Sequence, residues 1–367
     1  MASREFLRVE VVMPAGPRAE VVAKGEVGVY HCWNRCVQRA FLCGKDPVTG
    51  RDFEYRRQWL QQTEQSLAAL FAVEIAFHAE LSNHIHVVVR TRPDLSANWT
   101  DENVVRRWLC ITKLKRNGAG SIVEPTQEEM DRELRKPDRV AELRGRLANV
   151  SWFMGTLCES VSRRCNRDAE TSGAFWEHRF NCRCLASEAA ILVCGSYVDL
   201  NAIHAQEAET PEESRHTSAC DRIQGLQARL SEDTADMAPA NSPLPDRWLC
   251  ELTLQDRDGG LGDVAAATGS PWRASDKGIL SLSLEKYLEL LDWTGRQIRS
   301  DKRGAIPASL APILDRLGIA REQWLDAITC FDQWFGRVVG SVAALTAAAQ
   351  RVGHSFRGAR QCAQVFG

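Results

Sequence analysis

The pattern of apolar and polar positions predicts a run of strands and helices in the first half of the chain. Residues 27–37 have the β-branched and aromatic composition of a strand. Residues 54–71 repeat apolar positions at helical spacing and leave a face rich in Gln, Arg and Glu, which predicts an amphipathic helix. Residues 71–90 contain two short apolar runs separated by Ser82-Asn83, a pattern typical of a β-hairpin.

Two further helices follow the predicted hairpin. Helical spacing predicts one over residues 101–117, with Thr100 or Asp101 as its cap, and another over residues 151–167. The segment between them is highly charged. It is therefore predicted to form a mostly helical insertion over about residues 117–150.

A last strand and helix complete the predicted order. Residues 175–185 have strand composition, and Ser187 with Glu188 predicts the start of a helix that ends at Ala205. The order is then strand, helix, strand, strand, further helices, strand, helix. This order predicts an α+β fold that resembles a βαββαβ sandwich with one insertion.

The composition changes after this first domain, which is assigned to residues 1–209. Residues 210–247 are acidic and rich in Pro, Ser and Thr, so they are predicted to form a linker. Beyond them, apolar residues at helical spacing predict helices over residues 284–298 and 324–334. Residues 248–367 are therefore predicted to form an α-helical C-terminal region.

The overall composition narrows the class of protein. A hydrophobic content of 44% and a charged content of 26% are ordinary for a globular protein. No apolar run approaches the roughly 18 residues that cross a membrane, and the N-terminus lacks the pattern of a secretory signal. The 13 cysteines are odd in number and scattered, unlike a secreted disulfide framework. A cytoplasmic location is expected. The net charge of −2 gives no overall basic signature of nucleic-acid binding.

Candidate chemistry begins in the second strand of the hairpin. His84 and His86 occupy alternate positions of a strand, so they share one face, while Ile85 and Val87 point into the opposite layer. Two neutral imidazoles on a stiff strand form half of a site for a divalent metal. Alternatively, they are only the polar face of a half-exposed strand. A metal site needs a third ligand from elsewhere.

The helix that ends the first domain offers such a ligand. Tyr197 and Asn201 are four residues apart, so they share a face, and His204 lies on that face one turn further on. If this face covers the histidines, Asn201 completes a metal site of two imidazoles and one oxygen, with Tyr197 over the ion. Bound Mg²⁺ or Mn²⁺ would polarise a phosphodiester, and the tyrosine hydroxyl would attack phosphorus to form a covalent intermediate. The alternative is that Tyr197 is a core aromatic and Asn201 a helix-end residue.

Three motifs occur together in the first domain. Asn83-His84-Ile85-His86 contains His-hydrophobic-His, residues 175–180 read Phe-Trp-Glu-His-Arg-Phe, and residues 197–205 read Tyr-Val-Asp-Leu-Asn-Ala-Ile-His-Ala. This combination resembles the single-tyrosine HUH transposases, and among them the REP-associated tyrosine transposases and their longer bacterial relatives. Further segments agree with the longer relatives: 30–37, 39–44, 151–154, 293–295 and 301–307. The resemblance therefore spans nearly the whole chain.

The resemblance implies a fold, an activity and a set of site residues. It implies a ferredoxin-like catalytic domain that cuts and rejoins single-stranded DNA, often beside a hairpin, in a nucleoid-associated setting. It implies His84, His86 and Asn201 as ligands of Mg²⁺ or Mn²⁺, and Tyr197 as the nucleophile that forms a 5′-phosphotyrosine link. Relatives act either as monomers or as homodimers, and both states stay open for this chain.

Two positions depart from the family pattern. Ala202 stands in place of a usual Pro, which relaxes the end of the helix. His204 stands in place of a usual Arg and weakens any phosphate contact at neutral pH. This change and the near-neutral charge motivate an alternative, a domesticated nucleic-acid-binding protein that keeps the fold without turnover. A third interpretation is a structural zinc site formed by the two histidines with Cys182 and Cys184.

Single-stranded DNA binding requires a positive track with aromatic side chains on which bases stack. The candidates in the predicted sheet and the helix that follows it are Trp33, Arg35, Arg39, Arg90, Arg179 and His204. A second candidate surface, for a hairpin stem, is formed by Arg299, Lys302, Arg303, Arg357 and Arg360 in the C-terminal region.

Overall fold

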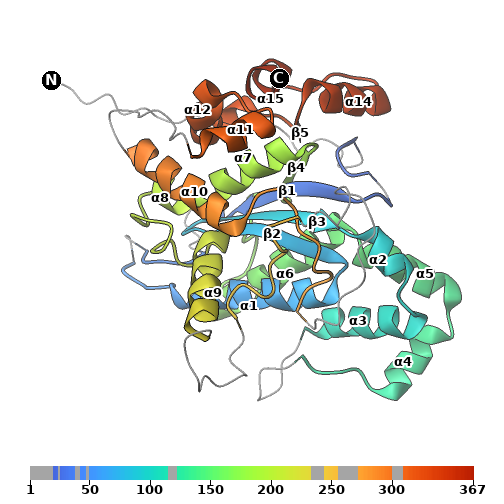
Figure 1. Cartoon of the computed structure of the whole chain (residues 1–367). Coiled ribbons are helices and arrows are strands. Elements are labelled where there is room, and N and C mark those ends of the chain that lie inside the picture. The colour runs from blue at the N-terminus through green and yellow to red at the C-terminus, as the bar shows by residue number, and fades with distance from the viewer. Residues whose placement is uncertain are drawn as a thin grey trace.

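The computed structural model shows how these patterns are realised. It describes residues 20–23, 25–37, 42–46, 49–114, 122–232, 244–254, 272–299 and 309–367. Within them the chain has a mixed α+β fold built on a five-stranded, mostly antiparallel sheet with the strand order β2-β3-β1-β4-β5. Helices cover both faces of this sheet (Figure 1).

The predicted hairpin forms the first half of the sheet. Strands β2 (Val73–Glu80) and β3 (His84–Thr91) pair antiparallel. Strand β1 (Gly28–Arg35) lies between β3 and β4 (Asn181–Leu185) and is antiparallel to both. The short strand β5 (Val338–Val339) runs parallel to β4 at the edge of the sheet. The C-terminal region therefore contributes a strand as well as helices.

One face of the sheet is covered by the helices that the sequence predicts between the strands. These are α1 (Tyr55–Leu70) and α6 (Val150–Asp168), which pack against each other, and α3 (Asp101–Lys113), which contacts α1. The hydroxyl of Thr100 accepts a backbone N–H in the first turn of α3, and the side chain of Asn149 does the same for α6. These caps fix where the two helices begin.

The charged insertion is mostly helical, as predicted. It contains α4 (Gln127–Leu134), which begins with a capping box between Thr126 and Glu129, and α5 (Pro137–Leu147), which has proline in its first turn. Both helices pack against α3, and α5 also contacts the short helix α2 (Pro93–Ala97).

The opposite face of the sheet is covered by α7 (Glu188–Asp199), whose cap is the Ser187 hydroxyl. Gly195 permits close contact with the sheet, because a Cβ atom there would lie 2.5 Å from the ring of Phe77. The predicted helix over 188–205 is interrupted at Leu200, and its last turn is a separate helix, α8 (Asn201–His204).

The C-terminal region packs over α7 and shares one hydrophobic core with it (Figure 1). The helix predicted over 324–334 is split at Cys330 into α12 and α13. The elements of this region are α10 (Leu284–Arg299), α11 (Ala311–Arg316), η2 (Arg321–Gln323), α12 (Trp324–Thr329), α13 (Phe331–Trp334), α14 (Val342–Val352) and α15 (Ala359–Phe366).

Two further segments differ from the sequence-based expectation. The predicted linker over 210–247 contains α9 (Ser218–Glu232), which packs against β2. Its first turn is held by Asp199, whose Oδ1 accepts the backbone N–H of Ala219 at 3.0 Å. Residues 233–243 of that linker lie outside the described residues. The strand predicted over 175–185 is regular only in its second half, β4.

No helix in the described parts of the chain combines the length and apolar character needed to span a membrane.

Candidate active site at the histidine strand

The alternation of β3 places its two histidines as the sequence predicts. Ile85 and Val87 are buried in the core beneath α1 and α6, whereas Val88 is buried in the core that contains α7. His84 and His86 share the side of Val88, because side chains alternate along a strand. Their rings lie 5.0 Å apart, edge to face. Both imidazoles therefore face α7, which carries Tyr197.

A third imidazole joins this pair from the neighbouring strand. His31 of β1 is fully buried, and its Nε2 lies 2.9 Å from Nδ1 of His86, with the two rings stacked 5.1 Å apart. This contact occupies Nδ1 of His86, so the other ring nitrogen, Nε2, is directed toward Asn201. A second imidazole in this position orients a metal-binding histidine in the way that outer-shell partners commonly do.

Asn201 reaches the same point from α8. Its carboxamide nitrogen lies 3.3 Å from Nε2 of His86. A half-turn of the carboxamide exchanges this nitrogen for the oxygen, since the two atoms differ little in size. Asn201 also lies close enough to His84 to affect its pKa. The structure thus brings His84, His86 and Asn201 together, although they come from two separate parts of the chain.

The electrostatics of this group favour metal binding. Burial lowers the pKa of His84 to about 4, with a contribution from the charge of Arg35. Burial lowers the pKa of His86 to about 3, with a contribution from His84. Both rings are therefore neutral at physiological pH and keep a lone pair for an ion. Two imidazoles and one carboxamide fit a divalent metal and suit Mn²⁺ better than Mg²⁺, because imidazole is a softer ligand than oxygen.

Tyr197 lies beside the histidines. Its ring is 5.5 Å from the ring of His86, edge to face, and its hydroxyl donates a 2.7 Å hydrogen bond to Oδ2 of Asp332. Phe331 stacks on the tyrosine ring at 4.9 Å. Burial raises the pKa of Tyr197 well above its usual value, and the carboxylate of Asp332 raises it further. The phenol is therefore protonated and needs a base to become a nucleophile.

Asp332 of α13 is positioned to be that base. Its carboxylate forms a 3.1 Å ion pair with Arg183 of β4, whose guanidinium lies over the ring of Trp33 at 4.4 Å. Partial burial opposes ionisation of Asp332, but the positive charge of Arg183 and the hydrogen bond donated by Tyr197 outweigh it and lower the pKa of the carboxyl group. The carboxylate is therefore charged while it accepts the hydrogen bond of Tyr197.

Sequence reasoning missed three polar residues of this site. His31 could have been found from the sequence, because it lies two residues before Trp33 on a predicted strand and therefore shares its face. Arg183 had a weaker signal of the same kind in β4. Asp332 had none, because it lies 135 residues after Tyr197 and reaches it only through the packing of the C-terminal helices.

The residues proposed for DNA binding are placed differently from one another. Trp33 and Arg35 are half-buried near the histidines, and Arg35 pairs with His84 across the β1–β3 ladder. Arg179 is exposed just before β4, and His204 is half-buried at the end of α8. Arg39 lies outside the described residues.

Arg90 is not available to DNA in this structure, which corrects its assignment as a DNA contact. Its side chain is fully buried and donates to Glu74 at 2.6 Å and to the carbonyl oxygens of Lys277 and Gly278, both at 2.7 Å. The guanidinium therefore ties the segment around residues 275–278 to the sheet. The sequence places Arg90 in the predicted sheet, but it does not indicate the segment that covers its side chain.

The second candidate surface lies only partly within the described residues. Arg357 and Arg360 are exposed in the C-terminal region, and Arg357 donates to the carbonyl oxygen of Gln333. The Arg299 side chain and residues 302–303 lie outside the description.

The structural zinc site is not formed either. Cys182 and Cys184 flank Arg183 on β4; Cys182 contacts the core on the α1 side of the sheet, and Cys184 contacts the cores on both sides. Arg183 instead contacts Asp332 on the histidine side. The two cysteines therefore alternate away from the histidines. Among the described residues, one group of three His, Cys, Asp or Glu side chains is close enough together to hold a metal ion. It lies elsewhere and consists of Glu64, His78 and Glu80.

Comparison with known proteins adds little to this geometry. No family model matches the chain. No curated protein matches it. Among solved structures, the chain resembles a REP-associated tyrosine transposase bound to a REP hairpin, with a TM-score of 0.31 and 10% sequence identity over 60% of this chain and 90% of that one. At this TM-score the likeness indicates a distant structural relationship and supports no residue role.

Proposed function

We propose that the chain is a metal-dependent endonuclease and strand transferase for single-stranded DNA that acts through a covalent 5′-phosphotyrosine intermediate. The observation that carries this proposal is the meeting of Tyr197 and Asn201 with His86, at 5.5 Å between rings and 3.3 Å between nitrogens. A phenol, two neutral imidazoles and a carboxamide in one site are the groups that such a reaction uses.

The strand order supports a ferredoxin-like domain of the HUH type. Strands β2, β3, β1 and β4 each run antiparallel to their neighbours in that order. The connections β1-α1-β2 and β3-α6-β4 place their helices in contact with each other. This is the arrangement expected of a βαββαβ sandwich in which the first and third strands are central.

In the proposed reaction, His84, His86 and Asn201 hold Mg²⁺ or Mn²⁺. When bound there, the ion polarises the scissile phosphate as a Lewis acid. The hydroxyl oxygen of Tyr197 attacks the phosphorus while its proton passes to the carboxylate of Asp332. A bond from phosphorus to the phenol oxygen forms, the bond from phosphorus to the 3′ oxygen breaks, and the departing 3′ oxygen takes a proton from solvent. Attack of a 3′-hydroxyl on the phosphotyrosine reverses these steps and rejoins a strand.

The surroundings of the site offer contacts for a nucleic acid. Arg183 lies over the rings of both Trp33 and Phe331, at 4.4 and 4.9 Å. Arg35 ends β1 and the exposed Arg179 lies just before the paired strand β4, so both add positive charge at this end of the two strands. Aromatic rings interleaved with guanidinium groups suit the stacking of unpaired bases and the binding of their phosphates. The substrate class proposed is therefore single-stranded DNA, and the neighbouring hairpin is the expectation that the sequence resemblance implies.

The decisive experiment is adduct formation with the full chain. A pool of hairpin-forming single-stranded oligonucleotides, with different dyes at the 5′ and 3′ ends, is incubated with the protein and Mn²⁺ and separated on a denaturing gel. We expect the 3′ dye to migrate with the protein and the 5′ dye to be released. Tyr197→Phe should give no adduct, whereas the control Tyr55→Phe, on an exposed tyrosine, should match the wild type.

Two outcomes would contradict the proposal. An undiminished adduct from Tyr197→Phe would exclude this tyrosine as the nucleophile. Migration of the 5′ dye with the protein would mean a 3′-phosphotyrosine link and the opposite cleavage polarity.

A second candidate function is a nucleic-acid-binding protein without turnover. The observation that favours it is that Phe331 covers the tyrosine ring and Asp332 occupies its hydroxyl. Binding of the hairpin pool in a gel-shift assay, with no adduct in Mg²⁺ or Mn²⁺, would support this function over the enzyme.

A further inference from the structure

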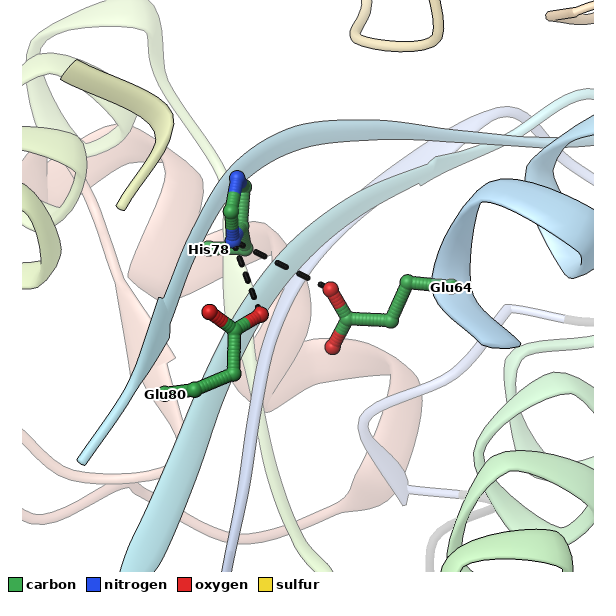
Figure 2. A group of neighbouring side chains, drawn as sticks. All are labelled: Glu64, His78 and Glu80. Carbon is green, nitrogen blue, oxygen red and sulfur yellow. Dashed lines mark hydrogen bonds and ion pairs between the residues drawn. The ribbon is translucent and has the colours of Figure 1, made fainter. Parts of the chain in front are cut away.

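A second cluster of polar side chains lies on the opposite face of the same hairpin. His78 and Glu80 of β2 pair with Val87 and Ile85 of β3, so they point toward α1 and away from the candidate active site. Glu64 of α1 points back at them (Figure 2). All three side chains are completely or almost completely buried.

The cluster converges on one point. Nδ1 of His78 lies 2.9 Å from Oε1 of Glu80 and 3.8 Å from Oε2 of Glu64. One ligand atom from each of the three residues lies within 4.8 Å of the other two. Figure 2 shows both carboxylates directed at the same edge of the imidazole ring. The distances of 2.9 and 3.8 Å from Nδ1 of His78 to the two carboxylates are short enough for ligands that share one ion.

Of the four carboxylate oxygens, only Oε1 of Glu80 has a hydrogen-bond partner, which is His78. Neither oxygen of Glu64 receives a hydrogen bond, and Oε2 of Glu80 receives none, although all three atoms are buried. Two carboxylates so close together repel each other, and buried charges are retained only when they are paired or coordinate a metal. A divalent cation balances the charge of both groups and satisfies the open oxygens at once.

The second ring nitrogen of His78, Nε2, also has the kind of partner that is usual for a metal-bound histidine. Nε2 of His78 lies 3.4 Å from Oδ2 of Asp221 in α9, and Asp221 is held by the side-chain amide of Gln61 at 2.9 Å. A carboxylate on the remaining ring nitrogen is the usual outer-shell partner of a metal-bound histidine, because it fixes the ring and the tautomer. The other charged groups near the cluster are Arg57, which donates to the backbone carbonyl of Glu80, and Arg222, which donates to that of Ala76.

From these observations we propose that Glu64, His78 and Glu80 form a second, structural metal site that binds one divalent transition ion, Zn²⁺ or Mn²⁺, and joins α1 to the edge strand β2. Two carboxylates with one imidazole suit such ions. The site does not depend on the proposed DNA chemistry, since it lies on the other side of the sheet and contains no nucleophile. Its complete burial indicates a role in stability, with no open position for substrate.

The test is metal content and thermal stability of the full chain in a background that lacks the first site. The variant His84→Ala/His86→Ala is freed of metal, loaded with Zn²⁺ or Mn²⁺, passed through a desalting column and measured by mass spectrometry of the metal. We expect one equivalent of ion to remain. Adding Glu64→Gln should remove it, whereas adding the control Glu54→Gln, on an exposed glutamate before α1, should not.

The melting temperature gives an independent readout. Removing the ion should lower the melting temperature of the background protein by roughly 5 °C, since ligand binding stabilises the folded state. The Glu64→Gln protein should show no metal-dependent shift. The proposal is overturned if the background protein keeps no ion, or if Glu64→Gln keeps it. Unchanged or higher stability of the metal-free Glu64→Gln protein would show that this variant folds, because glutamine removes a buried charge without changing size.

Discussion

Asp332→Asn separates the role of the carboxylate from that of the tyrosine. Asparagine is nearly isosteric and its carboxamide oxygen can still accept the hydrogen bond that Tyr197 donates at 2.7 Å. What is lost is the negative charge and the ability to take a proton. A general base in hydrogen-bond contact with its nucleophile contributes about 10²–10⁴-fold to a rate. We therefore expect the rate of adduct formation at pH 7 to fall by about 10²–10³-fold.

The pH profile of the same reaction distinguishes base catalysis from simple disruption. The pKa of Asp332 lies below its usual value, so the wild-type rate should not vary through protonation of this group between pH 5 and 8. In Asp332→Asn the proton must pass to hydroxide, so the rate should rise about tenfold for each pH unit. Single-turnover kinetics in Mn²⁺, with the adduct quantified on denaturing gels, measures both profiles.

The variant has a stability cost that must be measured beside the rate. Arg183 is almost completely buried and loses its counterion, but the Asp332 side chain is 46% exposed, so solvent screens the pair. We expect a loss of about 1 kcal/mol, less than the 3–5 kcal/mol of a fully buried broken pair. A wild-type rate and flat pH profile in Asp332→Asn would refute the assignment of this residue as the base. A faster rate would instead indicate that Asp332 restrains the tyrosine.

Two further predictions concern the sheet that carries the site. In metal-free buffer the pKa of folded His86 is about 3, below the unfolded value of about 6.5, so its stabilising contribution is present above pH 6.5 and is lost as the pH falls toward 3. Urea unfolding should therefore show the wild type losing about 2 kcal/mol more than His86→Asn between pH 7 and pH 5. Equal losses would contradict the buried neutral state. Gly195→Ala should destabilise the fold by about 1–3 kcal/mol, because its Cβ would lie 2.5 Å from the Phe77 ring, and Phe77→Leu should recover part of that loss in the same assay.

Helices and strands were predictable from the sequence where a short local pattern, such as a helix cap or a turn, determines them. Thr100 and Ser187 cap the helices that they were expected to begin, and the hairpin forms around Ser82 and Asn83. The strand predicted over 175–185 was too long, because the aromatic residues at its start pack against other parts of the chain and do not belong to the regular strand β4. The indole N–H of Trp176 donates to the carbonyl oxygen of Cys158 in α6 at 2.9 Å, outside any regular strand ladder. Composition alone does not distinguish these two uses of an aromatic residue.

The positions of the histidine pair and of the Tyr197–Asn201 pair were predictable from the sequence. The contact of Asp332 with Tyr197 was not. The alternation of His84 and His86 and the spacing of Tyr197 and Asn201 follow from short-range geometry. The helix is interrupted at Leu200, yet Tyr197 and Asn201 still approach His86. Asp332 depends on how helices of the C-terminal region pack over α7, and no local pattern encodes that.

A single irregularity of β2 decides which face carries which chemistry. Ile75 faces α1, and strict alternation would turn Phe77 to the same side and His78 toward α7. The register shift between Ile75 and Phe77 prevents this, so Ala76 and Phe77 both lie in the core on the α7 side and His78 faces α1. The bulge thus keeps the phenyl ring against Gly195 of the tyrosine helix and places the imidazole beside Glu64. Because of it, the two histidine clusters on adjacent strands lie on opposite faces of one sheet and do not compete for the same ion.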